Sequence, residues 1–242
     1  MTKKIVGVIC ALTIEMELFS KKLNNLKKEV ICGHEFFVGL LDNNVVVLTI
    51  SGIGKVNSGI ITMLLIEHYQ PDLVINSGIA GGVNKKLKTL DVVIATGTIY
   101  YDVDMTSDVT TSLRYGQLQD LPFVYKTDEV MIDTLRNINF PFSCYYGIIM
   151  TGDQFVSDYH KVSMIVDNHF QDLDVLACDM ESCSIAQVCY LFKTKCLIIR
   201  AISDVVGSNR PFDYSTFAPK AASNAALITL SILKNGSVTT NG

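Results

Sequence analysis

Apolar runs of strand length alternate along the chain with segments whose apolar residues recur at helical spacing. The runs predict strands at residues 4–12, 35–41, 44–50, 72–78, 90–104, 144–153, 174–180 and 195–204. The helical spacing predicts helices at residues 13–28, 54–69, 128–137, 159–169, 181–192 and 215–233. Pro219 falls in the early turns of the last helix, where proline is tolerated only if the helix starts late. The polar segment 105–125 is predicted to be a surface excursion.

The order of these elements predicts the fold class. Residues 35–41 and 44–50 flank "DNN" and are typical of a hairpin. The other strands are nearly continuous runs of Val, Ile and Leu, which indicates burial on both faces of a sheet. We therefore expect an α/β fold with a mostly parallel sheet. The chain of 242 residues is expected to form one domain over residues 1–234, with a frayed tail at residues 235–242.

Composition narrows the function classes. Hydrophobic residues make up 49% of the chain and charged residues 18%, which favours a large core and argues against disorder. The formal net charge is −4, and no stripe of Lys and Arg is present. A nucleic-acid partner and an electrostatic membrane anchor are therefore not expected.

The N-terminus and the cysteines indicate the compartment. The apolar run from Ile5 to Leu12 follows lysines, as in a signal peptide, but it is short and acidic residues follow it. We interpret it as a buried strand, and no transmembrane helix is expected. The seven cysteines contain no C-x-x-C pair, and the four histidines are scattered. These features favour a reduced, cytoplasmic protein without a metal.

Polar residues past the ends of strands are candidates for chemistry, because open α/β sheets bind ligands there. Glu15 follows the first strand, although an acid in the first turn of a helix is also a structural preference. The segments "SGIGKVNSG" and "NSGIAGG" match neither the P-loop nor the dinucleotide pattern. They are ordinary tight turns and close approaches to the backbone, or else a floor where a ligand meets the backbone.

Two further strand ends carry charge. Glu181 lies where a strand becomes a helix, as a purely structural carboxylate or as an acceptor for the two hydroxyls of a ribose. Asp179 is expected to point to the other side of the strand and is given no chemistry. Arg200 and Asp204 are four residues apart in "LIIRAISDVVG", where they either neutralise each other or leave a protonated Asp204 as a general acid.

Six stretches, in order, carry a resemblance that spans about residues 5–230. They are "SGIGKVNSG", "INSGIAGG", "YYDVDMT" with "YGQL", "TGDQFV", "DMESCSIAQVC" and "RAISDV". Together they resemble the methylthioadenosine/S-adenosylhomocysteine nucleosidases of the purine nucleoside phosphorylase-like superfamily. The resemblance implies a homodimer with a three-layer α/β/α fold, in which a central mixed, twisted sheet curls into a partial barrel. It implies a small nucleoside as substrate and no cofactor.

The resemblance also implies a role for each matching residue. Glu15 matches the acid that activates water, Asp204 the acid that protonates adenine N7, and Glu181 the carboxylate that holds the ribose 2′- and 3′-hydroxyls. The other matching positions are Met180 on the sugar, Phe155 and the Val156 backbone on adenine, Ser203 beside Asp204, Arg200 near the water, and Leu12, Ile53 and Phe212 as apolar walls. Met105 matches a residue that is lent to the pocket of the partner subunit. Ile79 departs from the serine that many members carry, and the segment around 106–118 is longer than expected.

Three alternatives remain open from the residues. A phosphorylase would need cationic groups around an anion site, whereas "VINSGIAGG" offers Asn76 and Glu15 would repel phosphate. A nucleosidase for another 5′-group, such as futalosine, would need a less apolar 5′-pocket. A non-catalytic nucleoside-binding module would not need both Glu15 and Asp204.

Overall fold

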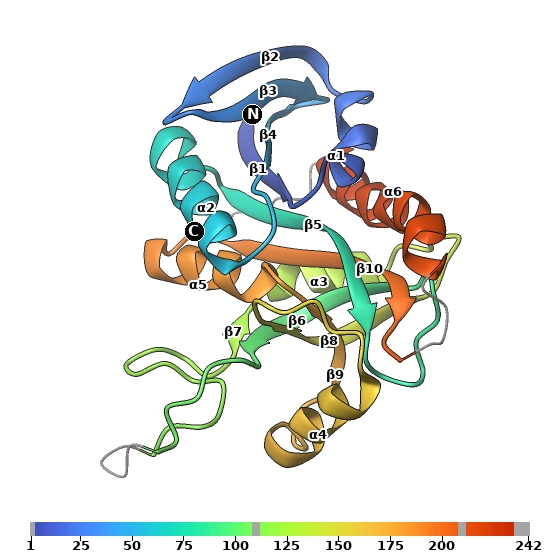
Figure 1. Ribbon diagram of the computed structural model, residues 1–242. Helices are drawn as coiled ribbons and strands as arrows, with labels where there is room; N and C mark the ends of the chain where they lie inside the picture. Colours follow the sequence, from blue (N-terminus) through green and yellow to red (C-terminus); the bar gives the residue numbers. More distant parts are fainter. Residues whose placement is uncertain (1–2, 108–111, 208–211, 235–242) are drawn as a thin grey trace.

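Strands and helices alternate along most of the chain (Figure 1). The computed structural model describes residues 3–107, 112–207 and 212–234, with the backbone alone at residues 212 and 213. In these ranges the strands are β1 (Lys4–Cys10), β2 (Asn24–Ile31), β3 (His34–Leu41), β4 (Asn44–Ile50), β5 (Leu73–Gly82), β6 (Val92–Tyr100), β7 (Tyr125–Lys126), β8 (Cys144–Thr151), β9 (Val175–Asp179) and β10 (Cys196–Val205). The helices are α1 (Thr13–Ser20), α2 (Lys55–Tyr69), α3 (Glu129–Arg136), α4 (Tyr159–His169), α5 (Ser182–Phe192) and α6 (Phe212–Lys234).

The strands form one mixed sheet that closes on itself. Its order is β10-β6-β8-β9-β5-β1-β4-β3-β2, and β7 pairs with β6. Because β10 also pairs with β5, the strands β5, β10, β6, β8 and β9 make a closed barrel. From β5 the sheet continues through the parallel strands β1 and β4 to the antiparallel edge of β3 and β2. The expected mixed sheet that curls into a barrel is confirmed.

The central strands are buried on both faces, which produces the three layers. Val8 of β1 packs in the core beneath α1, α3 and α6, whereas the next residue, Ile9, packs in the core beneath α2 and α5. Ile199 and Ile198 of β10 divide between the two cores in the same way. A third, smaller cluster joins α4 to the strands near it. The expected α/β/α layering is confirmed.

The N-terminal region differs from the prediction. The helix expected at residues 13–28 ends at Ser20, and Asn24–Ile31 forms β2, an edge strand paired with β3. The residues of β2 are exposed or half-buried, so the strand has no alternating apolar pattern to reveal it. Its two lysines are typical of an edge strand, where charge opposes pairing with other chains.

The start of α6 also differs from the prediction. The helix begins at Phe212 rather than at residue 215, so Pro219 lies in its interior instead of its first turn. Pro219 is exposed, so its ring lies on the solvent side of the helix. The alanines of the other face, among them Ala221, Ala222 and Ala225, are buried in the core shared with β5 and β10.

Candidate active site

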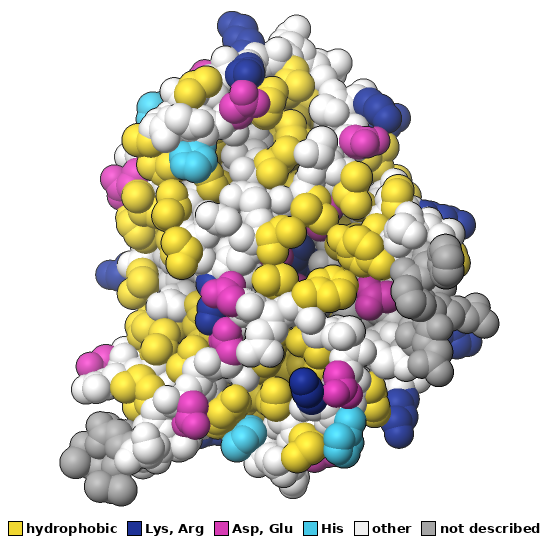
Figure 2. Space-filling model, in the orientation of Figure 1, with side chains coloured by type: hydrophobic (Ala, Val, Ile, Leu, Met, Phe, Trp, Pro, Cys, Tyr) yellow, Lys and Arg dark blue, Asp and Glu magenta, His cyan; other side chains and the backbone are white. Residues whose placement is uncertain are grey.

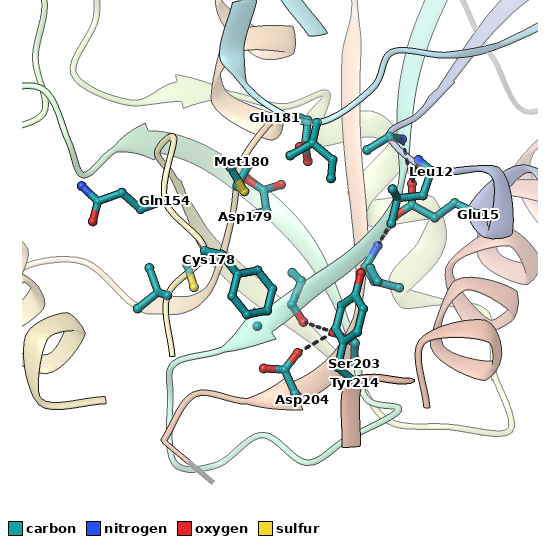
Figure 3. Close-up of a pocket in the computed structure, with 17 residues that line it drawn as sticks. Leu12, Glu15, Gln154, Cys178, Asp179, Met180, Glu181, Ser203, Asp204 and Tyr214 are labelled. Atoms are coloured by element: carbon teal, nitrogen blue, oxygen red, sulfur yellow. Dashed lines mark hydrogen bonds between the residues drawn. The ribbon is translucent and has the colours of Figure 1, made fainter. Parts of the chain in front are cut away.

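Residues at or just past the carboxyl ends of β1, β5, β9 and β10 surround one pocket. β5 and β9 pair only through Gly81–Cys178 and Gly82–Ala177, so their carboxyl ends meet there. The pocket measures about 630 Å³ with its open mouth included, a size suited to a small-molecule ligand. Apolar side chains gather around a hollowed region in the middle of the face drawn in Figure 2. The pocket is lined by Ala11, Leu12, Glu15, Ile53, Ile79, Ala80, Gly81, Gln154, Phe155, Val156, Cys178, Asp179, Met180, Glu181, Ser203, Asp204 and Tyr214 (Figure 3).

Glu15 is a buried carboxylate held by backbone N–H groups. Its Oε2 accepts hydrogen bonds from the backbone N–H groups of Ala11 at 2.7 Å and Leu12 at 2.9 Å. Its Oε1 accepts from the backbone N–H of Ile79 at 2.9 Å. Burial raises the pKa of Glu15, while Arg200 and these N–H groups lower it. The carboxylate is therefore fixed in the pocket, at the junction of β1 and β5.

Arg200 of β10 lies behind the pocket, fully buried among three carboxylates. Its Nη2 lies 2.8 Å from Asp179 Oδ2 and 3.0 Å from Glu181 Oε2. Its Nη1 lies 3.8 Å from Glu15 Oε1. The sequence spacing allowed an ion pair between Arg200 and Asp204. The guanidinium turns toward the other three acids instead. One cation thus organises acids from α1, β9 and the start of α5.

Asp179 corrects an expectation. Instead of pointing to the other side of β9, its carboxylate lies at the pocket and pairs with Arg200. Thr151 Oγ1 donates to Oδ1 at 2.6 Å, and the Ser182 hydroxyl and N–H also donate to the carboxylate. β9 ends at this residue, so strand alternation no longer predicts the direction of its side chain.

Glu181 joins the glycine turn before α2 to the start of α5. Its Oε1 accepts from the backbone N–H of Gly54 at 3.0 Å, while its Oε2 faces Arg200. The pKa of Glu181 is raised to about 7, because burial and the nearby charge of Asp179 raise it more than Arg200 lowers it. Each carboxylate oxygen still has a lone pair for a hydroxyl group in the pocket.

Asp204 lies apart from Glu15 and Glu181 in the pocket (Figure 3). β10 carries an irregularity between Ile202 and Asp204 in its pairing with β5, and Ser203 is the residue passed over. Ser203 Oγ donates to Asp204 Oδ1 at 2.7 Å. Bulges of this kind redirect side chains at the ends of strands. The irregularity is thus positioned to set how Asp204 faces the pocket.

Gly78 of β5 lies where Glu15 and Arg200 approach each other. A Cβ atom at this position would lie 2.8 Å from Glu15 Cδ and would also collide with Arg200 Nη1. The first glycine of "GIAGG" is therefore required by the close approach of two side chains to the backbone. Of the interpretations that the sequence left open, this one is a close approach to the backbone and not a tight turn.

Aromatic and apolar side chains form the remaining walls. The Phe155 ring is 71% exposed at the rim and packs edge-to-face against Tyr214, with centroids 6.0 Å apart. Burial raises the pKa of Tyr214, and nearby Glu15, Asp204 and Glu181 raise it further. Cys178 and Gln154 complete the lining. Tyr214, Cys178 and Gln154 were not predicted from the sequence, although Gln154 and Cys178 adjoin residues that were.

The pocket brings together most of the predicted site residues. They are Leu12, Glu15, Ile53, Ile79, Phe155, Val156, Met180, Glu181, Ser203 and Asp204, with Arg200 directly behind. Met105 is half-buried and lies outside this pocket. The side chain of Phe212 lies outside the described residues, and Tyr214, two residues later, lines the pocket. In the described ranges, no three His, Cys, Asp or Glu side chains are placed to hold a metal ion. No helix there is long and apolar enough to cross a membrane.

Comparisons with known proteins place these features in a family. The model of the phosphorylase superfamily matches residues 5–234. The chain is 36% identical over 237 residues to a 5′-methylthioadenosine/S-adenosylhomocysteine nucleosidase of Psychromonas ingrahamii, covering 95% of this chain and 98% of the relative. The crystal structure of such a nucleosidase from Neisseria meningitidis, in complex with methylthio-immucillin-A, matches with a TM-score of 0.89 and 35% identity, covering 96% and 99% of the two chains. Futalosine hydrolase of Helicobacter pylori matches with a TM-score of 0.87 and 25% identity, covering 96% and 98%.

Proposed function

Because the chain belongs to the phosphorylase superfamily and, within it, to the methylthioadenosine/S-adenosylhomocysteine nucleosidases, we propose that it hydrolyses the N-glycosidic bond of both nucleosides. The products are adenine and the 5-thio-ribose, and 5′-deoxyadenosine is a further substrate. The observation that carries this proposal is the pocket itself, in which Glu15, Glu181 and Asp204 surround one nucleoside-sized space.

Asp204 is the general acid of the proposed reaction. The bond breaks through a transition state like a ribosyl cation, and adenine leaves poorly as an anion. A proton from Asp204 to N7 converts adenine into a neutral leaving group, an effect of about 10²–10⁴-fold for a positioned acid. The contact with Ser203 Oγ fixes the carboxyl in the pocket wall.

Glu15 holds and activates the attacking water. Its oxygens already accept three backbone N–H groups, which fix the carboxylate and leave a lone pair for one water. Arg200 Nη1 lies 3.8 Å from Glu15 Oε1, so a water near both is oriented by a donor and an acceptor. Holding the water in place lowers the activation barrier by several kcal/mol. The upper limit for ideally aligned reactants is about 7–11 kcal/mol.

Glu181 orients the sugar through the ribose 2′- and 3′-hydroxyls, and Met180 packs against the ring. Phe155 stacks on adenine while the Val156 backbone reads the edge of the base. Leu12, Ile53 and Ile79 supply apolar walls, and we assign Phe212 or Tyr214 to the closure of the base side. The high exposure of Phe155 is consistent with a ring whose face is free to stack on adenine.

Hydrolysis is favoured over phosphorolysis by the charges in the pocket. Four acids line it, and the buried Arg200 is already surrounded by three of them. A phosphate dianion would meet repulsion rather than the cationic cradle it requires. A futalosine-type substrate is the second candidate, since a futalosine hydrolase shares the fold. The apolar side chains Ile53 and Leu12 at the pocket favour a thioether at the 5′-position.

The proposed active form is a homodimer in the cytoplasm. Val56, Ile60 and Met63 form an exposed apolar face along α2, which we call the α2 face. We propose that a second copy of the chain packs on the α2 face and lends its Met105 to the rim of this pocket. The seven cysteines, which are free thiols, fit a reducing compartment.

The test is adenine release by the purified protein from methylthioadenosine, S-adenosylhomocysteine, 5′-deoxyadenosine and futalosine, with and without phosphate. We expect release from the first three without phosphate. Glu15→Gln and Asp204→Asn should each lower the rate by at least about 10²-fold without unfolding the protein. Glu17→Gln, which changes an exposed acid of the same helix, is the matched control. Near-normal turnover in Glu15→Gln or Asp204→Asn would refute the role of that residue, and dependence on phosphate would refute hydrolysis.

A further inference from the structure

The Asp179 carboxylate is the one buried acid of the pocket to which the proposed reaction gives no task. Its side chain is 2% exposed and lies at the end of β9, between β8, β10 and the start of α5. The donors around it come from three elements: Thr151 Oγ1 at 2.6 Å, Arg200 Nη2 at 2.8 Å, and the hydroxyl and N–H of Ser182. With this set of donors, the hydrogen bonds and the ion pair offset much of the free energy of burying the carboxylate. Removing one partner would leave a buried charge uncompensated.

The contacts of the three guanidinium nitrogens of Arg200 show how its side chain is held. Nε donates to Ser182 Oγ at 3.1 Å, and Nη2 faces both Asp179 and Glu181. Nη1 is buried and has no hydrogen-bond partner among the described residues. Nη1 is also the nitrogen nearest to Glu15, at 3.8 Å. The guanidinium is thus held from one side, and its other side is presented to the water-binding acid.

We propose that Asp179 is a positioning residue that anchors Arg200. With Asp179 in place, Nη1 faces Glu15, and Nη2 is divided between Asp179 and Glu181 instead of pairing with Glu181 alone. This proposal rests on the proposed function. Without the charge of Asp179, the strongest partners left for Arg200 are Glu15 and Glu181 themselves. A guanidinium that closes onto either acid occupies the oxygens needed for water or ribose.

A structural role is the competing explanation. Thr151 Oγ1 donates to Asp179 and accepts from the backbone N–H of Cys183 at 2.9 Å, so this cluster also holds the first turn of α5. Thr151→Val removes that support and keeps the charge of Asp179. Asp179→Asn keeps the volume and most hydrogen bonds but removes the charge. The two variants therefore separate anchoring of the helix from control of Arg200.

The pH profile gives a readout that a structural role does not move. Glu181 is faced by Arg200 from β10, Asp179 from β9, Glu15 from α1 and Tyr214 from α6. Asp179 raises the pKa of Glu181, and Arg200 lowers it. Removing the Asp179 charge therefore lowers the pH at which Glu181 ionises, and the acid limb of kcat/KM moves with it.

The experiment measures adenine release from methylthioadenosine between pH 4.5 and 9 for the wild type, Asp179→Asn and Thr151→Val. For Asp179→Asn we expect kcat to fall by about 10²-fold while KM changes less, since a misplaced catalytic group costs about that much. We also expect its acid limb to shift to lower pH. Thr151→Val should keep the wild-type limb, whatever its rate.

The outcomes are distinguishable. A wild type that releases no adenine refutes the proposed function, not the anchoring. An active wild type refutes the anchoring if Asp179→Asn keeps its rate or its acid limb, or if Thr151→Val shows the same shift. If Asp179→Asn does not fold by circular dichroism, Ser182→Ala replaces it, because it removes the partner of Nε and a donor to Asp179. That variant should lower kcat more than it changes KM, and an unchanged kcat would refute the anchoring.

Discussion

At the scale of single residues, the burial of Glu181 couples the site to the stability of the fold. Burial raises the pKa of Glu181 to about 7, above its usual value of 4.5. Between these pH values the folded chain holds a proton that the unfolded chain has released. The stability that this group contributes is therefore complete below about pH 4.5 and is lost as the pH rises through about 7.

We predict that Glu181→Gln removes this dependence. The free energy of unfolding, measured by urea denaturation at pH 5 and pH 8, should fall less between these values in the variant than in the wild type. The difference is expected to be on the order of 2–3 kcal/mol, which is the part of the effect of the raised pKa that is lost between pH 5 and pH 8. Glu17→Gln should behave as the wild type. Identical slopes for Glu181→Gln and the wild type would contradict the buried, proton-holding state.

The residues of the site differ in how far the sequence reveals them. Glu15 and Glu181 lie just past strand ends, and Asp204 lies in the last residues of β10, so a local rule and the family motifs both identify them. Asp179 was assigned to the wrong side because alternation along β9 was extended to its last residue. Tyr214 carries no signal in the sequence, since its place depends on where α6 begins. The roles of all these residues remain predictions.

At the scale of elements, the approach of β5 to α1 and β10 depends on the absence of one side chain. Gly78 leaves room for Glu15 and Arg200, and a methyl group there would overlap both. We predict that Gly78→Ala lowers adenine release by more than about 10²-fold. The variant should also lose about 1–3 kcal/mol of stability through overpacking.

Gly59 of α2 offers a matched control. A Cβ there would meet Val188 at 3.9 Å, an ordinary contact, and alanine favours a helix by about 0.5–1 kcal/mol over glycine. Gly59→Ala should therefore keep its activity and match or exceed the wild type in thermal stability. The close-approach explanation would be wrong if Gly78→Ala and Gly59→Ala had the same activity and melting temperature.

The elements missed by the sequence analysis share a physical cause. Hydrophobic periodicity reports burial, so it located β1, β5, β9 and β10, whose residues are mostly buried. β2 buries almost nothing and is specified by its pairing with β3, which lies outside any local window. Pro219 lies inside α6 on its exposed side, although a proline in a helix interior removes a backbone hydrogen bond and crowds the preceding turn.

At the scale of the whole molecule, barrel closure assembles the site. β10 pairs with β5 on one side and β6 on the other, and this closure brings Arg200 to acids that are 19 to 185 residues away in the chain. Motifs predict which strands belong to such a sheet, but they do not contain the contacts across it. The pocket could therefore be predicted from the sequence, but the ion-pair network behind it could not.

The loop after β6 carries the residue that we propose to reach a second copy of the chain. Met105 lies on this loop, outside the pocket of its own chain. Farther along the loop, Arg114 forms a two-pronged ion pair with Asp172, at 2.8 and 2.7 Å, and its guanidinium lies over the ring of Phe123. The loop is thus tied to the body of the protein beside α4.

We predict that Ile60→Glu on the α2 face converts the proposed dimer into a monomer with little activity, because a buried unpaired charge opposes association. Sedimentation velocity at micromolar concentration gives the state, and adenine release the activity. Val130→Glu, on an exposed apolar residue of α3, should remain dimeric and active. Met105→Ala should remain dimeric but raise KM for methylthioadenosine, since the partner's pocket loses apolar contact with the 5′-group. A monomeric wild type that releases adenine, or a fully active Ile60→Glu monomer, would show that each chain carries a complete site.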